Sequence, residues 1–330
     1  MSPDVLTREI GRSGIQASAV GLGTWAIGGW MWGGTDEAAS IRAIEASIDA
    51  GISLIDTAPA YGLGRSEELV GQAIAGKRDK VVIATKCGLN WHSGKGNQFF
   101  EEDGVPVHRY LGADGIAHEV EQSLTRLGTD HIDLYITHWQ DATTPIDETM
   151  DALLRLVEHG KIRAIGASNV GTAEMAAYLA TGRLDAFQER YSMLDRGIEE
   201  TLLPMARPAG VSMLSYSSLA LGLLTGKVSA SRVFKGDDQR AADPRFSAEN
   251  RQRAADFAAA LEPLADRHDA SIAQLAIAWT LNQPGITFAL CGARDPAQAL
   301  DNAKAARLRL DAADLAHIEA ARASHLAAIP

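Results

Sequence analysis

Four side chains with complementary acid–base chemistry stand at or just after the ends of predicted strands. Asp56 follows the apolar run ISLI, Lys86 follows VVIAT and His138 follows IDLYIT, while Tyr61 lies five residues beyond Asp56. Taken alone, an aspartate after a strand is often only a helix cap, and a histidine there is more often structural than catalytic. An acid, an amine, a phenol and an imidazole after three neighbouring strands instead favour one shared chemical function.

These four groups suit the reduction of a carbonyl by hydride. Negative charge develops on the carbonyl oxygen as hydride attacks, and a nearby acid must then give up a proton near neutral pH. A free phenol, with a pKa of about 10, is too weak an acid for this step. A neighbouring ammonium favours the phenolate, so we expect Lys86 to lower the pKa of Tyr61. In this interpretation Asp56 pairs with Lys86, and His138 orients the carbonyl by a hydrogen bond.

The elements that must position these residues follow a strand–helix alternation. Short β-branched runs alternate with longer Ala-rich segments of helical period, which predicts βαβ units and a parallel sheet. Eight strands are predicted, at Ala19–Leu22, Ile52–Ile55, Val81–Thr85, Ile132–Ile136, Ile162–Ala167, Asp185–Gln188, Val211–Ser215 and Ile286–Leu290. Helices are predicted after the N-caps Thr35 and Ser66, and at Ala117–Leu127, Asp147–Glu158, Thr172–Leu179, Ile198–Ala206, Glu249–Arg267, Ile272–Asn282, Pro296–Ala305 and Ala312–Ala321.

Eight strand–helix units predict an α/β fold of the (β/α)8 TIM-barrel type with an extra C-terminal helix, and an open doubly wound sheet is the alternative. In a barrel the carboxyl ends of all strands meet at one face, where the active sites of such enzymes lie. That arrangement brings the four reactive side chains to one rim. Two long irregular loops are expected, Cys87–Gly112 after the third strand and Leu221–Phe246 after the seventh, and such loops are usually functional. We expect one domain over residues 1–330.

Composition and charge narrow the classes of protein that the chain can represent. The net charge of −11 and the pI near 5.3 argue against nucleic-acid binding. No run reaches the ~18 apolar residues of a membrane span, and MSPDVLTREIGRSG at the N-terminus does not have the features of a signal peptide. Cys87 and Cys291 form no disulfide framework, which fits a reducing cytoplasm. We expect a cytoplasmic monomer or homo-oligomer whose partner is a small molecule.

Two other patterns are set aside. Gly62 and Gly64 begin a G-x-G pattern, but the third glycine of a dinucleotide-binding fingerprint is missing at Glu67. A second group has the residue types of a metal site: His131, Asp133, His138 and Asp141. Its first two members fall on or before the fourth strand, away from the rim that carries the histidine after that strand. We therefore expect no bound metal.

Longer motifs resemble the aldo-keto reductase superfamily. They are GLGTW at Gly21–Trp25, DTAPAYGLGRSEELVG at Asp56–Gly71, IGASNV at Ile165–Val170, QERYSML at Gln188–Leu194, SYSSLALGLLTGK at Ser215–Lys227 and the segment Arg294–Asn302, with the contexts of Lys86 and His138. They span nearly the whole chain in the expected order, so the combination is specific although no single motif is. The stretch GGWMWGG at Gly28–Gly34 is similar to bacterial sugar and inositol-catabolism-type members.

The resemblance implies an NAD(P)H-dependent oxidoreductase that reversibly reduces an aldehyde or ketone to the alcohol. Tyr61 would be the general acid/base, with the other three reactive residues in the roles inferred above. Ser168, Asn169 and Gln188 would hold the nicotinamide carboxamide, and Tyr216 would stack on the nicotinamide ring. The remaining cofactor contacts would come from Gly23, Thr24, Trp25, Ser217, Leu219, Gly222, Arg294, Gln298 and Asn302.

Two departures from the family pattern bear on the cofactor. Ser218 stands where many members have proline, and Gly292 lies near the place of a lysine often found early in the adenosine-binding segment. Arg294 must then recognise a 2′-phosphate, for which a guanidinium fork is suited, although the neighbouring Asp295 weakens the local positive charge. We therefore expect NADP(H) as the cofactor, with NAD(H) as the alternative.

Aromatic residues in the predicted loops indicate the substrate class. Aromatic faces commonly pack on the C–H surfaces of sugars, so the mixture of rings and polar groups favours a sugar or sugar-derived carbonyl and a place in carbohydrate metabolism. The residues considered for substrate binding are Trp25, Trp32, Trp91, His92, Trp139, Gln140 and Asp141. Two alternatives stay open: a non-catalytic nicotinamide-binding regulatory subunit, since channel β subunits resemble the same superfamily, and a metal-dependent barrel isomerase or hydrolase.

Overall fold

Eight parallel strands close into a barrel in the computed structural model, which describes residues 5–229 and 231–330. The strands are β3 (Val20–Gly23), β4 (Leu54–Asp56), β5 (Val82–Cys87), β9 (Ile132–Thr137), β10 (Ile162–Ser168), β11 (Ala186–Arg190), β12 (Ser212–Tyr216) and β13 (Phe288–Gly292). Each pairs with the next one along the chain, and the last pairs with the first. The (β/α)8 prediction is confirmed, and the open sheet is wrong because β3 and β13 join the two edges.

Two expectations extend beyond the described residues. Residues 1–4 begin the N-terminal segment for which no signal peptide is expected, and residue 230 belongs to the long loop after the seventh barrel strand. Among the helices of the described ranges, none is long and apolar enough to cross a membrane.

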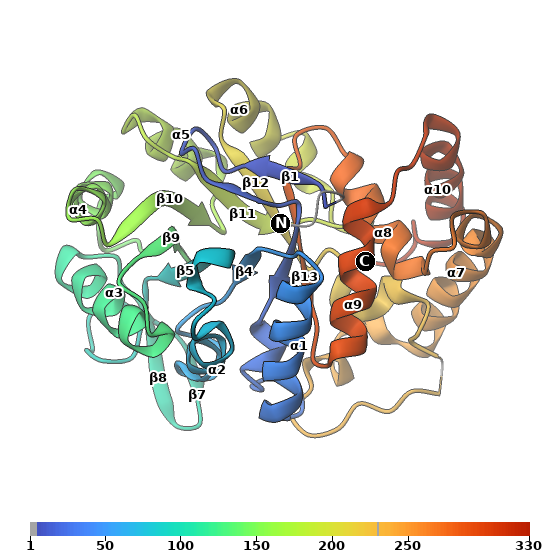
Figure 1. Cartoon of the computed structure of the whole chain (residues 1–330), viewed down its shortest axis with the longest axis horizontal. Coiled ribbons are helices and arrows are strands. Elements are labelled where there is room, and N and C mark those ends of the chain that lie inside the picture. Colours follow the sequence, from blue (N-terminus) through green and yellow to red (C-terminus); the bar gives the residue numbers. More distant parts are fainter. Residues whose placement is uncertain (1–4, 230) are drawn as a thin grey trace.

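Helices surround the barrel (Figure 1). Those that follow successive strands are α1 (Glu37–Asp49), α2 (Arg65–Ile74), α3 (Ala113–Leu127), α4 (Ile146–Glu158), α5 (Thr172–Ala180), α6 (Leu202–Ala209), α8 (Ile272–Asn282) and α9 (Pro296–Lys304). The expected extra helix, α10 (Ala312–His325), packs beside α7 (Ala248–His268). α6 starts at Leu202 rather than at the predicted Ile198, because the short turn η3 (Gly197–Glu199) intervenes.

A hairpin closes the base of the barrel. β1 (Thr7–Glu9) and β2 (Gln16–Ser18) pair antiparallel, and side chains in and beside them, Ile10, Ile15 and Ala17, join the apolar cluster inside the barrel. This cluster includes side chains from all the barrel strands except β3, such as Leu54 and Phe288. The carboxyl ends of the strands at the other rim are therefore the end left for chemistry.

The long segment after β5 is ordered rather than irregular. β6 (Leu89–Asn90), β7 (Asn97–Glu102) and β8 (Val105–Arg109) form a small antiparallel sheet in the order β6-β8-β7. Asp103 and Gly104, with φ of +50° and +80°, make the turn between β7 and β8, and two-residue hairpin turns favour an Asp-Gly pair. The expected irregular loop is wrong at this place, since the Asp-Gly pair specifies a hairpin. In Figure 1 this hairpin extends beyond the barrel beside α2 and α3.

The loop Leu221–Phe246 between β12 and α7 is irregular, as expected. Among its described residues the only regular elements are short 3-10 turns: η4 (Ala220–Thr225), η5 (Gln239–Ala241) and η6 (Pro244–Phe246).

Two predicted helix caps are displaced by one or two residues. Asp36, not Thr35, caps α1, because its carboxylate accepts a backbone N–H of the first turn at 2.9 Å. Gly64 stands at the N-cap of α2, so Ser66 lies inside the helix. The Ser66 hydroxyl instead lies 2.7 Å from the Thr24 hydroxyl, which ties α2 to the end of β3.

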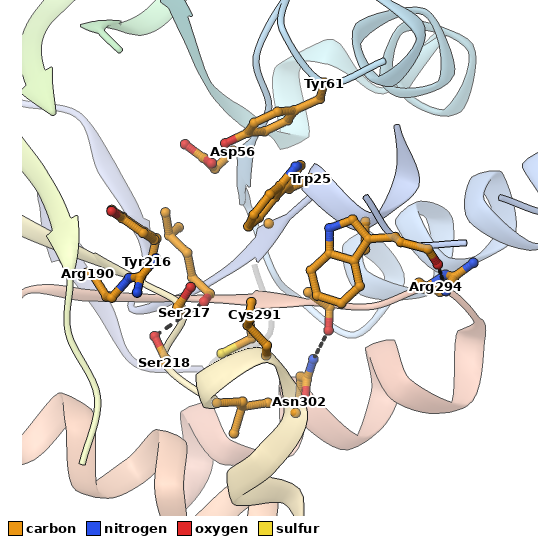
Figure 2. A pocket seen from close by; sticks show the side chains of 18 of the residues that line it. Trp25, Asp56, Tyr61, Arg190, Tyr216, Ser217, Ser218, Cys291, Arg294 and Asn302 are labelled. Atoms are coloured by element: carbon orange, nitrogen blue, oxygen red, sulfur yellow. Dashed lines mark hydrogen bonds between the residues drawn. The ribbon is translucent and has the colours of Figure 1, made fainter. Parts of the chain in front are cut away.

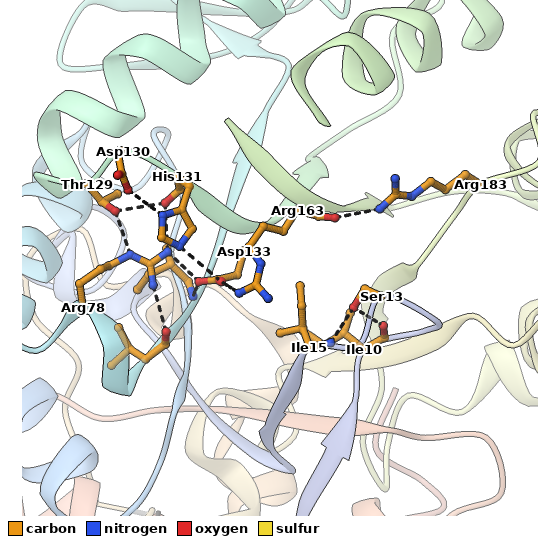
Figure 3. Close-up of polar contacts among 12 residues, drawn as sticks. Ile10, Ser13, Ile15, Arg78, Thr129, Asp130, His131, Asp133, Arg163 and Arg183 are labelled. Atoms are coloured by element: carbon orange, nitrogen blue, oxygen red, sulfur yellow. Dashed lines mark hydrogen bonds and ion pairs between the residues drawn. The ribbon is translucent and has the colours of Figure 1, made fainter. Parts of the chain in front are cut away.

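A buried carboxylate at the base of the barrel ties neighbouring strands together (Figure 3). Asp133 on β9 pairs with Arg78 at 2.7 Å and with Arg163 of β10 at 2.6 Å, and it accepts the Ile83 amide of β5 at 2.9 Å. A buried charge needs such partners. Because Asp133 stands near the start of β9 and His138 follows its end, the two cannot share a metal ion.

We expect Asp133→Ala to lower the free energy of unfolding by on the order of 3 kcal/mol, because two arginines lose a shared buried partner. Since the site chemistry lies at the other rim, kcat should not change. The control is Asp130→Ala, which removes a side chain that is 94% exposed and should cost less than about 0.5 kcal/mol. Urea unfolding of the wild type, Asp133→Ala and Asp130→Ala measures these stabilities. Equal free energies of unfolding would contradict the structural role of Asp133.

Candidate active site

The four reactive residues meet at the carboxyl rim. Asp56 ends β4, Lys86 lies near the end of β5, His138 follows β9, and Tyr61 lies in the β4–α2 loop. Lys86 Nζ lies 2.9 and 3.0 Å from the Asp56 carboxylate oxygens, 2.8 Å from the Thr57 carbonyl oxygen and 3.1 Å from the Tyr61 hydroxyl. The His138 ring stands edge-on to the Tyr61 ring, with centroids 5.8 Å apart. An amine, an acid, a phenol and an imidazole thus form one cluster, as predicted.

Burial governs ionisation in this cluster. Burial raises the pKa of Tyr61, and the Lys86 ammonium acts against that rise. Burial also opposes the charge on Lys86, but Asp56 and Tyr61 keep the pKa of Lys86 above its ordinary value. Burial and then Lys86 hold the pKa of His138 well below its ordinary value. A cation therefore stands beside a protonated phenol and a neutral imidazole. Lys86 lowers the pKa of Tyr61, as expected, but burial raises it by more.

A cavity of about 600 Å³ runs from this cluster across the rim to Asn302 (Figure 2). Its volume lies in the range of small-molecule and cofactor sites. Three residues considered for substrate contact line it: Trp25, Trp32 and Trp139. The residues expected at a cofactor that line it are Gly23, Trp25, Ser168, Asn169, Gln188, Tyr216, Ser217, Leu219, Gly222, Arg294, Gln298 and Asn302.

The polar groups expected at a nicotinamide form a connected chain along one wall. The Ser168 hydroxyl donates to the Gln188 carbonyl at 2.7 Å, and the Gln188 side chain donates to the Asp56 carboxylate at 2.7 Å. The Tyr216 hydroxyl donates to the Asn169 side-chain oxygen at 2.8 Å, and Asn169 donates to the His138 carbonyl at 2.9 Å. These side chains have fixed orientations next to the cluster, so they can present amide-binding groups to a ligand.

A buried glutamate outside the cavity fixes the backbone of Asn169. Asn169 has a φ of +55°, which non-glycine residues adopt infrequently. The Glu189 carboxylate accepts the amide of the next residue, Val170, at 2.8 Å. Burial raises the pKa of Glu189 to about 7. Glu189 therefore holds the turn that points Asn169 into the cavity.

The segment after β12 contains several left-handed residues. Ser217, Ala220 and Leu221 have φ of +56°, +47° and +54°, and such strain clusters where ligands bind. Ser218, which replaces the proline of many family members, is buried, and its hydroxyl lies 2.9 Å from the Ser215 hydroxyl. The serine is therefore accommodated without an unpaired polar group.

The far end of the cavity carries a cation and a carboxylate side by side. Arg294 donates to the carbonyl oxygens of Trp32, at 3.1 Å, and of Gly34, so it bridges the β13–α9 and β3–α1 loops. Asp295 caps α9 and accepts the side-chain amide of Gln298 at 2.6 Å. A phosphate would find a partner in the guanidinium, and a ribose hydroxyl in the carboxylate.

Several residues considered for binding do not line this cavity. Thr24 is fully buried and donates to the main-chain carbonyl at the end of β4 at 2.9 Å. The Trp91 and His92 rings contact each other at 4.6 Å. Gln140 donates to a main-chain carbonyl at 3.0 Å, and Asp141 accepts a main-chain amide at 2.9 Å. Residues 5–229 and 231–330 hold no group of three or more His, Cys, Asp or Glu side chains suited to a metal ion.

Other side chains line the cavity although the sequence analysis does not select them: Trp30, Phe100, Arg190, Ser218, Arg240 and Cys291 are examples. Trp30 belongs to the quoted GGWMWGG motif, and Arg190 follows Gln188 by two positions on one strand, so motif and alternation could have found them. No local signal marks Phe100, because the hairpin that carries it reaches the rim only through tertiary contacts.

A second buried glutamate supports the strand that carries Lys86. Glu119 on α3 accepts the Gly88 amide at 2.8 Å, just beyond β5, and its other carboxylate oxygen has no partner among the described residues. Gly88 has a φ of +91°, which favours glycine. Burial raises the pKa of Glu119 to about 8. Near pH 7 a neutral carboxylic acid therefore holds the end of β5.

Comparisons with known proteins agree with this geometry. Residues 19–323 match the Aldo/keto reductase family. The chain belongs to this family. It is 48% identical over 293 residues to the aldo-keto reductase YhdN of Bacillus subtilis (strain 168), which covers 88% of this chain and 85% of the relative. It is 42% identical over 311 residues to the NADH-specific methylglyoxal reductase of Escherichia coli (strain K12), covering 92% and 94%.

A solved structure gives the same answer for the fold. The glycerol dehydrogenase AKR11B4 from Gluconobacter oxydans superposes with a TM-score of 0.87 at 39% identity, over 99% of this chain and 97% of that chain. The resemblance inferred from the motifs is confirmed, and this aldo/keto reductase is an enzyme of carbonyl reduction that uses NAD(P)H. The metal-dependent isomerase or hydrolase has no support from the family.

We expect the melting temperature to fall as the pH rises from about 6.5 to about 8.5, and to fall less in Glu119→Gln. Folded Glu119 keeps its proton up to a pKa of about 8, whereas the unfolded chain loses it near the ordinary value of 4.5. Between these values the unfolded state binds fewer protons, so stability decreases with rising pH. Glutamine keeps the acceptor for Gly88 but cannot ionise. Melting curves across this range check the prediction, and parallel pH profiles would contradict it.

Proposed function

We propose that this aldo/keto reductase reversibly reduces an aldehyde or ketone with Tyr61 as the general acid/base. The observation that carries the proposal is the 3.1 Å contact between Lys86 Nζ and the Tyr61 hydroxyl inside a buried cluster. When bound, the reduced cofactor would supply hydride, and the Tyr61 hydroxyl would give its proton to the carbonyl oxygen as hydride adds to the carbonyl carbon. The phenolate left behind is stabilised by the Lys86 ammonium. Asp56 fixes that ammonium through both carboxylate oxygens.

His138 is proposed to hold the substrate oxygen as a neutral imidazole. Its Nδ1 is buried without a partner among the described residues. A buried N–H without an acceptor is costly, so we place the ring proton on Nε2. His138 can then donate a hydrogen bond to the carbonyl oxygen without competing with Tyr61 for the proton transfer.

The connected polar wall is proposed to hold the nicotinamide. Ser168, Asn169 and Gln188 would bind its carboxamide, and Tyr216 would stack on its ring. Support comes from their positions at successive strand ends beside the Tyr61 cluster and from the hydrogen bonds that orient them. The left-handed segment with Ser217, together with Leu219 and Gly222, would hold the pyrophosphate, and Gln298 and Asn302 would contact the adenosine end.

We propose NADPH as the preferred cofactor, recognised by Arg294. A guanidinium at the adenosine end can form a forked contact with a 2′-phosphate. Asp295 and the NADH-specific relative make NADH the competing choice. Arg294 also bridges two loops, so its removal can weaken the binding of both cofactors. The ratio of the NADPH affinity to the NADH affinity therefore reports on recognition of the 2′-phosphate.

The substrate is proposed to be a small sugar or sugar-derived carbonyl, which would place the protein in carbohydrate metabolism. Aromatic rings beside Tyr61 support this proposal: Trp25 stacks on it with centroids 6.3 Å apart. The methylglyoxal reductase and the glycerol dehydrogenase, both similar to this chain, are named for short oxygen-rich compounds. We further propose one domain over residues 1–330, monomeric or homo-oligomeric, in the cytoplasm, where Cys87 and Cys291 stay unpaired.

We expect Tyr61→Phe to lower kcat by about 10²–10⁴-fold, the usual contribution of general acid catalysis. The ring is retained, so NADPH affinity and melting temperature should change little. Tyr110→Phe is the matched control, because it removes a phenol that does not line the cavity. Steady-state reduction of glyceraldehyde and fluorescence titration of NADPH, both in the presence of a chelator, provide the measurements.

Lys86→Met should also remove most turnover, and the double variant should be hardly worse than either single one, since both residues serve one proton transfer. Near-normal kcat in a folded, cofactor-binding Tyr61→Phe protein would exclude Tyr61 as the acid. A wild-type protein that binds NADPH but reduces no carbonyl would favour the regulatory subunit instead.

We expect Arg294→Ala to weaken NADPH binding much more than NADH binding. Losing a charge-assisted forked contact costs on the order of 1.5–3 kcal/mol, roughly ten- to a hundredfold in affinity. Arg267→Ala, which changes an arginine outside the cavity, should alter neither. Dissociation constants from fluorescence titration test this prediction, and an equal loss for both cofactors would show that Arg294 does not read the 2′-phosphate.

A further inference from the structure

The cavity is lined by a stacked pair of rings from two segments outside the barrel. Phe100 on β7 and Trp30 in the β3–α1 loop stack with centroids 4.9 Å apart and an interplanar angle of 21°. Both rings line the same cavity as Tyr61 and His138. The two segments are far apart in sequence and meet at this ring pair. We propose that Phe100 and Trp30 form an aromatic gate that limits the enzyme to short carbonyl compounds.

The β3–α1 loop, which carries the Trp30 side of the gate, is held by hydrogen bonds. The amides of Met31 and Gly33, on either side of Trp32, donate to the Asp237 carboxylate at 2.6 and 2.8 Å. Arg294 holds the carbonyl oxygen of Trp32 from a third loop. The loop that carries Trp30 is therefore fixed by side chains that do not touch Phe100.

The other side of the gate is a strand with a local irregularity. The pairing of β7 with β8 shifts register between Gln98 and Phe100, and such bulges redirect side chains. As a result two consecutive rings both find aromatic partners: Phe99 packs on Trp139 at 5.0 Å, and Phe100 packs on Trp30. Only the second of these two phenylalanines lines the cavity.

Phe100 is one of several side chains that attach the hairpin to the barrel. Val107 of β8 packs with Leu89 of β6 and with Ala60, the neighbour of Tyr61, and the Phe100 ring packs against this small core. The Arg109 guanidinium adds a second attachment, since it lies 3.7 Å from the Phe99 ring centroid and 4.9 Å from that of Trp139. The contacts of Val107 and Arg109 persist when the Phe100 ring is removed, so the hairpin keeps attachments that do not involve Phe100.

The inference rests on the proposed carbonyl reduction and adds an upper limit on the size of the carbonyl substrate. A pocket wall discriminates by about 10–200-fold per methylene that does not fit. A short hydroxy- or oxo-aldehyde can reach His138 and Tyr61 beneath the pair, whereas a two-ring aromatic aldehyde needs the space that Phe100 fills. Phe100 is thus a specificity-determining residue rather than a participant in proton transfer.

The test compares glyceraldehyde with 2-naphthaldehyde. In Phe100→Ala the ratio of kcat/KM for naphthaldehyde over glyceraldehyde should rise at least about tenfold. Phe99→Ala, the matched control on the same strand, should change that ratio by less than about twofold, and Phe100→Tyr should keep the wild-type ratio. Melting temperature and NADPH affinity establish that each variant is folded, and Phe100→Leu replaces the alanine variant if that one does not fold.

A binding measurement separates this inference from the proposed function. The dissociation constant of 2-naphthamide, which cannot be reduced, is measured for the NADPH-bound wild type and variants. Tighter binding to Phe100→Ala by about tenfold or more supports the gate even if no aldehyde is turned over. An unchanged constant together with an unchanged kcat/KM ratio in folded Phe100→Ala overturns it, as does an equal gain in Phe99→Ala.

Discussion

The buried Lys86 ammonium is the constraint on which the rest of the site depends. Removing a charge from water costs on the order of several kcal/mol unless the charge is paired and fully hydrogen-bonded. Its acceptors are the two Asp56 oxygens, the Thr57 carbonyl and the Tyr61 hydroxyl. Asp56 also accepts the Gln188 side chain from β11. One cation therefore fixes the ends of three barrel strands and the loop that carries the proposed acid.

The closed barrel and its loops contribute different parts of the site. The barrel brings the ends of β4, β5, β9 and β11 within contact distance, which supplies the polar cluster and the adjoining wall. The loops add the rings that exclude water: Trp25 over Tyr61, and Phe100 against Trp30. A drier site strengthens the interaction of Lys86 with a developing phenolate. The same burial raises the pKa of Tyr61 in the folded protein. Lys86 therefore lowers the pKa of Tyr61 only in comparison with an equally buried phenol that has no lysine beside it.

This aldo/keto reductase differs from a minimal (β/α)8 barrel in its insertions, the β3–α1 loop and the β7–β8 hairpin. Function commonly resides in such loops on a rigid scaffold. Asp237 holds the β3–α1 loop by accepting two of its amides, and Arg294 joins that loop to the start of α9. The β7–β8 hairpin has a core of its own around Val107. Access to the carbonyl site is thus set by elements that can change without disturbing the strands beneath them.

The sequence by itself determined the eight strands, most helices, the four rim residues and the family, because periodicity, residue chemistry and motif order are local properties. The N-caps Asp36 and Gly64 differ from the predicted Thr35 and Ser66, since several residues nearby can cap a helix. Only the tertiary structure decided that Thr24 and Gln140 bond to the main chain, that Asp133 pairs with two arginines, and that Phe100 meets Trp30. It also decided the direction of the Tyr61 pKa. These outcomes depend on burial and on contacts between segments distant in sequence, which no local pattern encodes.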